Sequence, residues 1–237
     1  MRANNGAVDE AFHKIIKMVL SRELRPGDRV YETNLVEDFK MSRTPIREAL
    51  SRLASTGFLE KLPKKKGYIV PILAPDDMEE IYCTRILLEG KAARRAAKYV
   101  DAESEKKLVW INQQEEEKFL ANEKEEYASL NEDFHMTIAE MSKNKYLLRY
   151  IQQLFWRSNL YVFFFMRFYN VQNIEQFMEA GNLRLSYKEH RKIIEAIIAG
   201  DGRRAEKAMQ EHLVIAYNSM LSPQAQPNIS FEEFDLD

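Results

Sequence analysis

The stretch from Met41 to Leu53 constrains the fold of this chain more than any other part of the sequence. Ser42 and Thr44 are favourable N-cap residues, and Pro45 suits the first turn of a helix, so a helix is predicted to begin here. Apolar residues then recur at the spacing of one helix face, at Ile46, Ala49, Leu50 and Leu53. Gly57 is the natural C-terminal stop of this helix.

Basic side chains accompany this helix and the segment that follows it. Arg43, Thr44 and Arg47 lie off the apolar face, and two β-like runs follow at residues 58–62 and 68–70. The pattern predicts a winged helix-turn-helix, with the helix in the major groove and the wing on the DNA backbone. The predicted DNA contacts are Arg43, Thr44, Arg47, Lys64, Lys65, Lys66 and Gly67. The alternative is an ordinary surface helix followed by a solvated basic loop.

Charge is distributed unevenly along the chain. Residues 1–72 hold 14 Lys and Arg against 9 Asp and Glu, a net charge of +5. The remaining residues hold 21 Lys and Arg against 28 Asp and Glu, a net charge of −7. A basic N-terminal region followed by an acidic remainder favours binding of a polyanion at the N-terminal end only.

Residues 1–72 are predicted to form the DNA-binding domain. A helix is expected over residues 9–23, after a frayed arm at residues 1–8. Val30 and Tyr31 are expected to pair with the wing as a short strand. The first helix of the helix-turn-helix is expected next, capped by Thr33 or Asn34.

The rest of the chain predicts an all-α bundle, so the fold class is mainly α. Pro71 and Pro75 mark the boundary, and no strand pattern follows up to residue 221. Helices are expected at 76–99, 102–120, 123–141, 144–169, 173–199 and 203–221, which form a domain at residues 76–221. The acidic, proline-containing tail at residues 222–237 is predicted to be disordered.

Three of the four histidines lie in the predicted bundle. His190 and His212 are about equally far from the Gly200–Gly202 turn, so an antiparallel hairpin would hold them at similar height. His135 lies on another helix, with Asn131 one turn earlier on the same face. Three imidazoles that meet inside a bundle would suit zinc or nickel. The spacing alone leaves open that each histidine is separately satisfied by a hydrogen bond.

These features together resemble the GntR family of bacterial transcription regulators, in its FadR-like branch. In the N-terminal region the resemblance rests on residues 42–50, Leu53, Gly57 and the wing that ends at Gly67. In the body, residues 85–89, 131–135, 190–197 and 200–212 resemble the FCD effector domain. One departure is the turn around Lys40, where the family usually has a glycine.

The resemblance implies a metal site and a ligand-responsive function. It implies that Asn131, His135, His190 and His212 are the ligands of a divalent metal, although the family more often has an aspartate at the position of Asn131. It also implies a homodimer that binds palindromic operator DNA, with a small organic or sugar acid that often relieves repression.

Arg85 is the candidate for binding the carboxylate of that effector through its planar fork. The alternative is a surface ion pair with Glu89, four residues on. Arg157 is a weaker effector candidate. The predicted helix 76–99 follows the linker directly, so it is a candidate route from the effector to the DNA-binding domain.

Bulk properties favour a cytoplasmic protein. Cys83 is the only cysteine, and the N-terminus lacks an apolar signal segment. The longest apolar run, residues 160–166, is far shorter than the ~20 residues that span a bilayer.

The sequence leaves two other functions open. One is a helical metalloenzyme whose metal activates water; the other is a DNA-binding protein whose bundle only dimerises.

Overall fold

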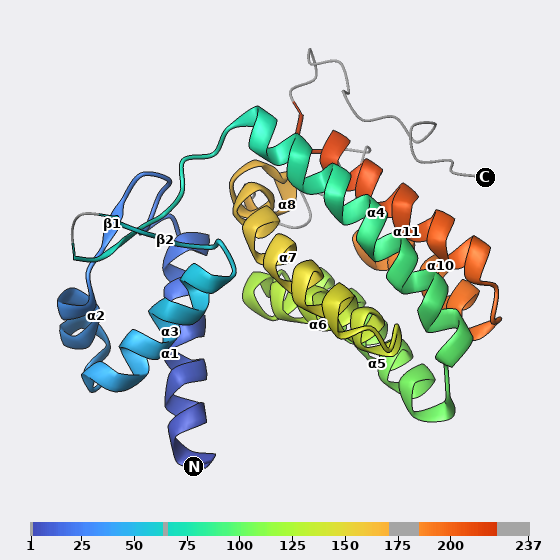
Figure 1. Cartoon of the computed structure of the whole chain (residues 1–237), viewed down its shortest axis with the longest axis horizontal. Helices are drawn as coiled ribbons and strands as arrows, with labels where there is room; N and C mark the ends of the chain where they lie inside the picture. Colours follow the sequence, from blue (N-terminus) through green and yellow to red (C-terminus); the bar gives the residue numbers. More distant parts are fainter. Residues whose placement is uncertain (1, 64–65, 171–184, 222–237) are drawn as a thin grey trace.

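The structure is a computed structural model that describes residues 2–63, 66–170 and 185–221. Its N-terminal part is the predicted winged helix-turn-helix (Figure 1), built from α1 (Arg2–Leu20), β1 (Arg29–Val30), α2 (Glu32–Phe39), α3 (Arg43–Ser55), β2 (Glu60–Lys61) and β3 (Tyr68–Ile69). β3 lies between β1 and β2 and is antiparallel to both. The predicted pairing of a strand near Val30 with the wing is thus confirmed.

Several predicted boundaries in this part were wrong. Residues 2–8 belong to α1 and are not a frayed arm. α1 ends at Leu20 rather than at residue 23, and Arg22 adopts a positive φ of 67° just beyond it. α2 begins at Glu32 with Tyr31 as its N-cap, so neither Thr33 nor Asn34 caps it.

The turn between α2 and α3 has the conformation that a glycine would favour. Lys40 has a φ of 54° and a ψ of 38°, in the left-handed region. An L-residue with a side chain costs about 1–2 kcal/mol there, so the lysine retains the turn at some cost in stability. Ser42 is the N-cap of α3, as predicted.

The C-terminal part is the predicted helical bundle. Its described elements are α4 (Pro75–Tyr99), α5 (Ala102–Leu120), α6 (Lys124–Met141), α7 (Lys145–Phe165), α8 (Arg167–Asn170), α10 (Ser186–Ile198) and α11 (Gly202–Asn218). The single helix predicted at 144–169 is two helices, because Met166 is extended and separates α7 from α8. α10 begins at Ser186, after a non-helical Leu185, so the helix predicted at 173–199 was wrong at this point. Residues 173–184 and the tail predicted to be disordered lie outside the described residues.

α7 lies at the centre of the molecule and contacts both parts (Figure 1). Trp156 of α7 packs edge-on against Phe12 of α1 and Phe58 of the DNA-binding part, with ring centroids 5.1 and 5.7 Å apart. Arg157, the next residue, bonds Asp77 at the start of α4. The buried apolar residues of both parts therefore form one continuous core.

Among the described helices, α4 and α11 pack against each other most extensively. Gly90 permits this packing, because a Cβ at this position would lie 2.9 Å from Cγ of Gln210. Within the described residues, no helix combines the length and apolar character needed to cross a membrane.

Candidate functional site

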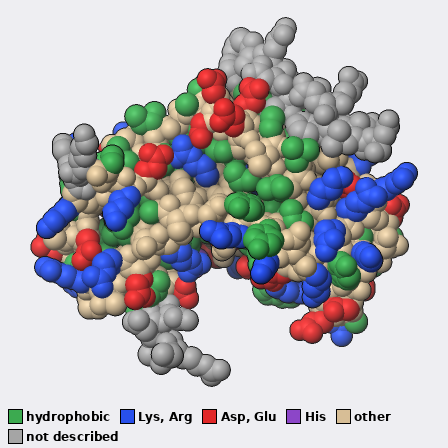
Figure 2. Space-filling view, viewed as in Figure 1, with side chains coloured by type: hydrophobic (Ala, Val, Ile, Leu, Met, Phe, Trp, Pro, Cys, Tyr) green, Lys and Arg blue, Asp and Glu red, His purple; other side chains and the backbone are tan. Residues whose placement is uncertain are grey.

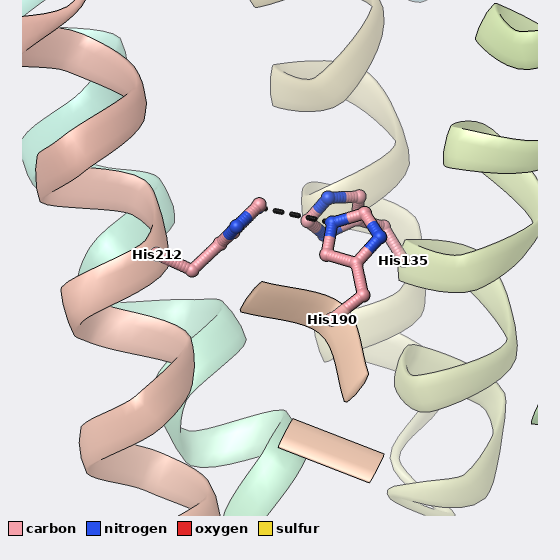
Figure 3. Close-up of side chains that lie close together, drawn as sticks. All are labelled: His135, His190 and His212. Carbon is pink, nitrogen blue, oxygen red and sulfur yellow. Dashed lines mark hydrogen bonds between the residues drawn. The ribbon is translucent and has the colours of Figure 1, made fainter. Parts of the chain in front are cut away.

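The three histidines of the bundle meet in its interior (Figure 3). His135 comes from α6, His190 from α10 and His212 from α11, and all three are buried. One ring nitrogen from each can be chosen so that all lie within 4.8 Å of one another. The Nε2 atoms of His190 and His212 are 3.3 Å apart.

Each of these histidines has a carboxylate against its Nδ1 atom. Glu89 lies 2.5 Å from His135, Glu115 lies 2.9 Å from His190, and Glu189 lies 2.8 Å from His212. A carboxylate on Nδ1 fixes the orientation of an imidazole and makes its Nε2 more basic, as is common around protein-bound metals. The Nε2 atoms of His190 and His212 face each other in this arrangement.

None of these three glutamates was predicted from the sequence to be a site residue. Glu115 lies in a run of three glutamates that is typical of a solvated surface, yet it is fully buried. Glu189 precedes His190 but bonds His212 on the neighbouring helix. The position of Glu89, four residues after Arg85, indicated only a pair with that arginine.

Burial and charge set the protonation of this cluster. Burial opposes ionisation of Glu89, but Arg85 and His135 together lower its pKa to about 2. Burial lowers the pKa of His135 to about 4, although Glu89 opposes this shift. At neutral pH the carboxylate is therefore ionised and the imidazole is neutral, which leaves the imidazole able to donate a lone pair to a metal.

Arg85 is buried beside the histidines rather than at the surface. Its Nε donates to Glu89 at 2.6 Å, and its Nη1 donates to Ser158 of α7 at 2.8 Å. The alternative of a surface ion pair was therefore right about the partner and wrong about the location. Burial opposes the charge, yet Glu89 holds the pKa of Arg85 above its usual value.

A small cavity of about 30 Å³ adjoins the histidines, and we call it the histidine cavity. Its lining includes Arg85, Asn131, His135, Asn159, Ser186 and His212. The half-buried Asn131 thus shares the cavity with two of the histidines. Arg157 is not part of this lining. It bonds Asp77 and forms a 3.5 Å ion pair with Glu60 at the boundary between the two parts.

A second candidate surface lies between α3 and the wing. A groove of about 910 Å³ is lined by Arg43, Arg47, Lys61, Lys66 and Gly67, together with Tyr31, Glu32, Thr33, Leu62, Pro63 and Tyr68. Figure 2 shows Lys and Arg side chains on this side of the molecule. Thr44 is exposed on α3 but does not line the groove, and Lys64 and Lys65 lie outside the described residues.

Gly67 has a structural reason to be a glycine. Its φ is 111°, and a Cβ would lie 3.0 Å from the carbonyl oxygen of Val30. The wing can therefore approach β1 only with glycine at this position. Tyr31 and Lys61 line the groove as well, although neither was predicted from the sequence to contact DNA.

Comparison with known proteins identifies both parts of the chain. The pattern of the bacterial regulatory proteins of the gntR family matches residues 7–69. The pattern of the FCD domain matches residues 80–214, which is more than half of the chain. The chain belongs to the GntR family, and it carries an FCD domain.

Relatives of this GntR protein are transcription regulators. It is 28% identical over 211 residues to YdhC of Bacillus subtilis, an uncharacterized HTH-type transcriptional regulator, and the match covers 87% of this chain and 86% of YdhC. It is 30% identical over 166 residues to the regulator McbR of Escherichia coli, covering 69% and 73% of the two chains. The transcriptional repressor RspR of Escherichia coli is 23% identical over 210 residues, covering 87% and 86%.

The solved structure of Escherichia coli McbR has the same fold as this GntR protein. The TM-score is 0.73, with 22% sequence identity and coverage of 92% of this chain and 96% of that one. The family and its relatives make this GntR protein a transcription regulator and not an enzyme. The prediction of a transcription regulator is therefore confirmed, and the alternative of a metalloenzyme is excluded.

Proposed function

We propose that this GntR protein is a repressor and that a small organic or sugar acid lowers its affinity for operator DNA. The acid binds beside a divalent metal, zinc or nickel, in the FCD domain. The protein acts as a homodimer, so its operator is palindromic with two half-sites. The similarity to the repressor RspR supports the direction of regulation.

The contact between His190 and His212 is the observation that carries the metal proposal. If each Nδ1 donates its hydrogen to the neighbouring glutamate, each Nε2 carries a lone pair. Two lone pairs 3.3 Å apart repel each other, and a cation between them removes the repulsion. Tetrahedral zinc with bonds of about 2.0–2.1 Å separates its ligands by roughly 3.3 Å. The spacing therefore fits a metal.

The donor set supports the same ion. His135, His190 and His212 would supply three imidazoles, and Asn131 would supply an amide oxygen from the cavity wall. A neutral amide is a weaker ligand than a carboxylate for a dication, so Asn131 would leave the metal more dependent on its histidines. Imidazole nitrogens suit zinc and nickel.

Arg85 is the proposed partner of the acid. It lines the histidine cavity, and its charge is retained by the pair with Glu89. A guanidinium beside a metal with an open position would attract a carboxylate from two sides. The cavity of about 30 Å³ has room for roughly two water molecules, so it would have to widen as the acid binds.

The groove between α3 and the wing is the proposed DNA surface. Arg43 and Arg47 would read base edges in the major groove, while Thr44, Lys66 and Gly67 would contact the backbone together with Lys64 and Lys65.

Metal analysis tests the proposal at the histidines. Protein purified without chelator should hold about one divalent ion per chain, and an excess of metal should raise its unfolding temperature. Metal at 100 times its dissociation constant adds about 2.7 kcal/mol to the free energy of unfolding. The double variant His190→Ala, His212→Ala should lose both the ion and the stabilisation.

The fourth histidine provides the matched control. His13 is exposed on α1, so His13→Ala should retain the ion. An unchanged metal content in the double variant would place the metal elsewhere. A wild-type protein without metal, or without a response to it, would instead favour a bundle that only dimerises.

Operator binding tests the response to acids. An operator selected from a pool of random duplexes should bind the metal-loaded protein, and a panel of small acids should weaken that binding. Arg85→Lys keeps the charge but loses the fork, so it should bind the acid less tightly and DNA equally well. An acid that binds equally with and without the operator would show that the two sites are not coupled.

A further inference from the structure

Two cavities of this molecule adjoin α7 on neighbouring faces. The histidine cavity is lined by Asn159 and Val162 of α7 and by Met166 just beyond it. A second cavity, of about 60 Å³ between α1, α6 and α7, is lined by Trp156, Asn159 and Phe163 of the same helix, and we call it the interdomain cavity. Among the described residues that line them, Asn159 of α7 is common to both. Its side chain is nearly fully buried, with 3% of its surface exposed.

The interdomain cavity lies where the DNA-binding part meets the FCD domain. Lys17 of α1 crosses its edge to form an ion pair with Glu125 of α6 at 3.0 Å. Trp156, one turn before Asn159, lines the same cavity and packs against Phe12 and Phe58. A change in the shape of this cavity therefore changes the contact between the two parts.

The turn of α7 around Asn159 already bonds groups on both sides. Ser158 accepts a hydrogen bond from Arg85, the proposed acid-binding residue. Arg157 bonds Asp77 and approaches Glu60 of the wing sheet, with 3.5 Å between its Nη1 and the Glu60 carboxylate. One turn of α7 thus contacts both Arg85 at the histidine cavity and Glu60 of the DNA-binding part.

We propose that Asn159 bonds the acid in the histidine cavity and, by moving, changes the packing of α1 against α7. The amide of asparagine can donate to a carboxylate or accept from a hydroxyl, so it can serve either group of a hydroxy or sugar acid. Asn159 is thus a positioning residue for the response as well as a ligand contact. The route from effector to DNA runs across α7 rather than along α4 from the linker. This inference rests on the proposed function.

Trp156 supplies a reporter of the packing change. The chain has two tryptophans, and Trp110 is 55% exposed on α5, so Trp110→Phe leaves Trp156 as the only one. In this background, zinc followed by acetate, the simplest carboxylate, is titrated into the full-length protein. We expect the emission maximum of Trp156 and its quenching by acrylamide to change when acetate binds.

Variants at Asn159 then test the route. Asn159→Leu keeps the approximate size but removes the amide, and Asn159→Ala provides a second variant if the first does not fold. In either variant the zinc content should be unchanged and the emission response to acetate lost. Asn34→Leu is the matched control, because Asn34 is exposed on α2 and lines neither cavity, and it should keep the response.

The outcomes separate this inference from the proposal on which it rests. A protein without bound zinc would refute the metal-dependent function, and the inference with it. Bound zinc and bound acetate with no change in Trp156 emission would refute the inference alone. So would an emission response in a folded Asn159 variant that equals the response of the parent.

Discussion

At the scale of single residues, Glu89 connects the metal site to the effector site. One of its carboxylate oxygens accepts from Arg85, and the other lies against His135. The orientation of a proposed metal ligand and that of the proposed acid-binding arginine therefore depend on the same buried group. Removing one member of a buried pair leaves an uncompensated charge, which typically costs 3–5 kcal/mol.

The pKa of His135 predicts a loss of stability in mild acid. Its pKa is about 4 in the folded protein and near 6.5 in an exposed histidine. Between these values the unfolded chain binds a proton that the folded chain does not, so the free energy of unfolding falls as the pH falls from 6.5 to 4. For this residue the loss reaches about 3 kcal/mol in metal-free protein. Urea unfolding at several pH values measures it.

Glu89 extends this loss to lower pH. Its folded pKa of about 2 lies below the ordinary 4.5, so its stabilisation is present above pH 4.5 and is lost as the pH falls toward 2. His135→Gln should flatten the dependence between pH 6.5 and 4, whereas His13→Ala should retain its slope. If the free energy of unfolding fell equally steeply with pH in His135→Gln and in the parent, His135 would not cause this pH dependence.

At the scale of elements, α3 combines a buried face with an exposed one. Ile46 and Leu50 are fully buried, while Arg43 and Arg47 are exposed at the groove. The buried face holds the helix against the rest of the domain, so the arginines project from a rigid support. The wing supplies Lys66 from the other side of the groove.

Two kinds of substitution should separate the roles of α3 and the wing. Arg47→Ala should weaken operator binding by about 1–3 kcal/mol and affect non-specific duplexes less, because a bidentate contact to guanine is lost. Lys66→Ala should weaken binding to all sequences and reduce the salt dependence by about one charge. Binding measured by fluorescence anisotropy at several salt concentrations distinguishes the two.

Arg203 provides the control for this experiment, since it is exposed on α11, in the FCD domain. Arg203→Ala should bind like the parent protein. If Arg43→Ala and Arg47→Ala both bound the operator like the parent, α3 would not read the bases.

At the scale of the whole molecule, the two parts share one hydrophobic core. Aromatic contacts of Trp156 and a polar contact from Gln153 to the backbone of Ser55 connect α7 with the DNA-binding part. Arg22, beyond α1, stacks on the ring of Phe164 and donates to the backbone of Phe163 at 2.8 Å. The DNA-binding part is therefore packed on the FCD domain through much of the length of α7.

Trp156→Ala should separate the two parts. Removing this side chain, which is 4% exposed, should cost about 3–5 kcal/mol and split a single thermal transition into two, because each part would then unfold independently. Calorimetry would show the two transitions. Trp110→Ala should change the stability by no more than about 0.5 kcal/mol, as expected for an exposed side chain. A single cooperative transition in Trp156→Ala would show that other contacts suffice.

The sequence alone determined the features that depend on residues close to one another along the chain. Capping, the apolar spacing of residues 46–53 and the glycine at position 57 define α3 locally, so its N-cap and its buried face agree with the prediction. The contact between His190 and His212 could also be predicted from the sequence, because both residues lie on one helical hairpin. Long helices such as α5 and α6 were found because a repeated pattern averages over many residues.

Only the tertiary structure decided which distant groups meet. Glu89 and His135 are 46 positions apart, and Glu115 and His190 are 75 apart, so no spacing rule relates them. The same holds for Arg85, whose buried location depends on α7 covering it through Ser158. Asn159 shows most clearly what the sequence alone could not predict. Helical periodicity indicates which face of α7 it occupies. The interdomain cavity, however, exists only because α1, α6 and α7 pack together, and the histidine cavity only because α4, α6, α10 and α11 pack around α7.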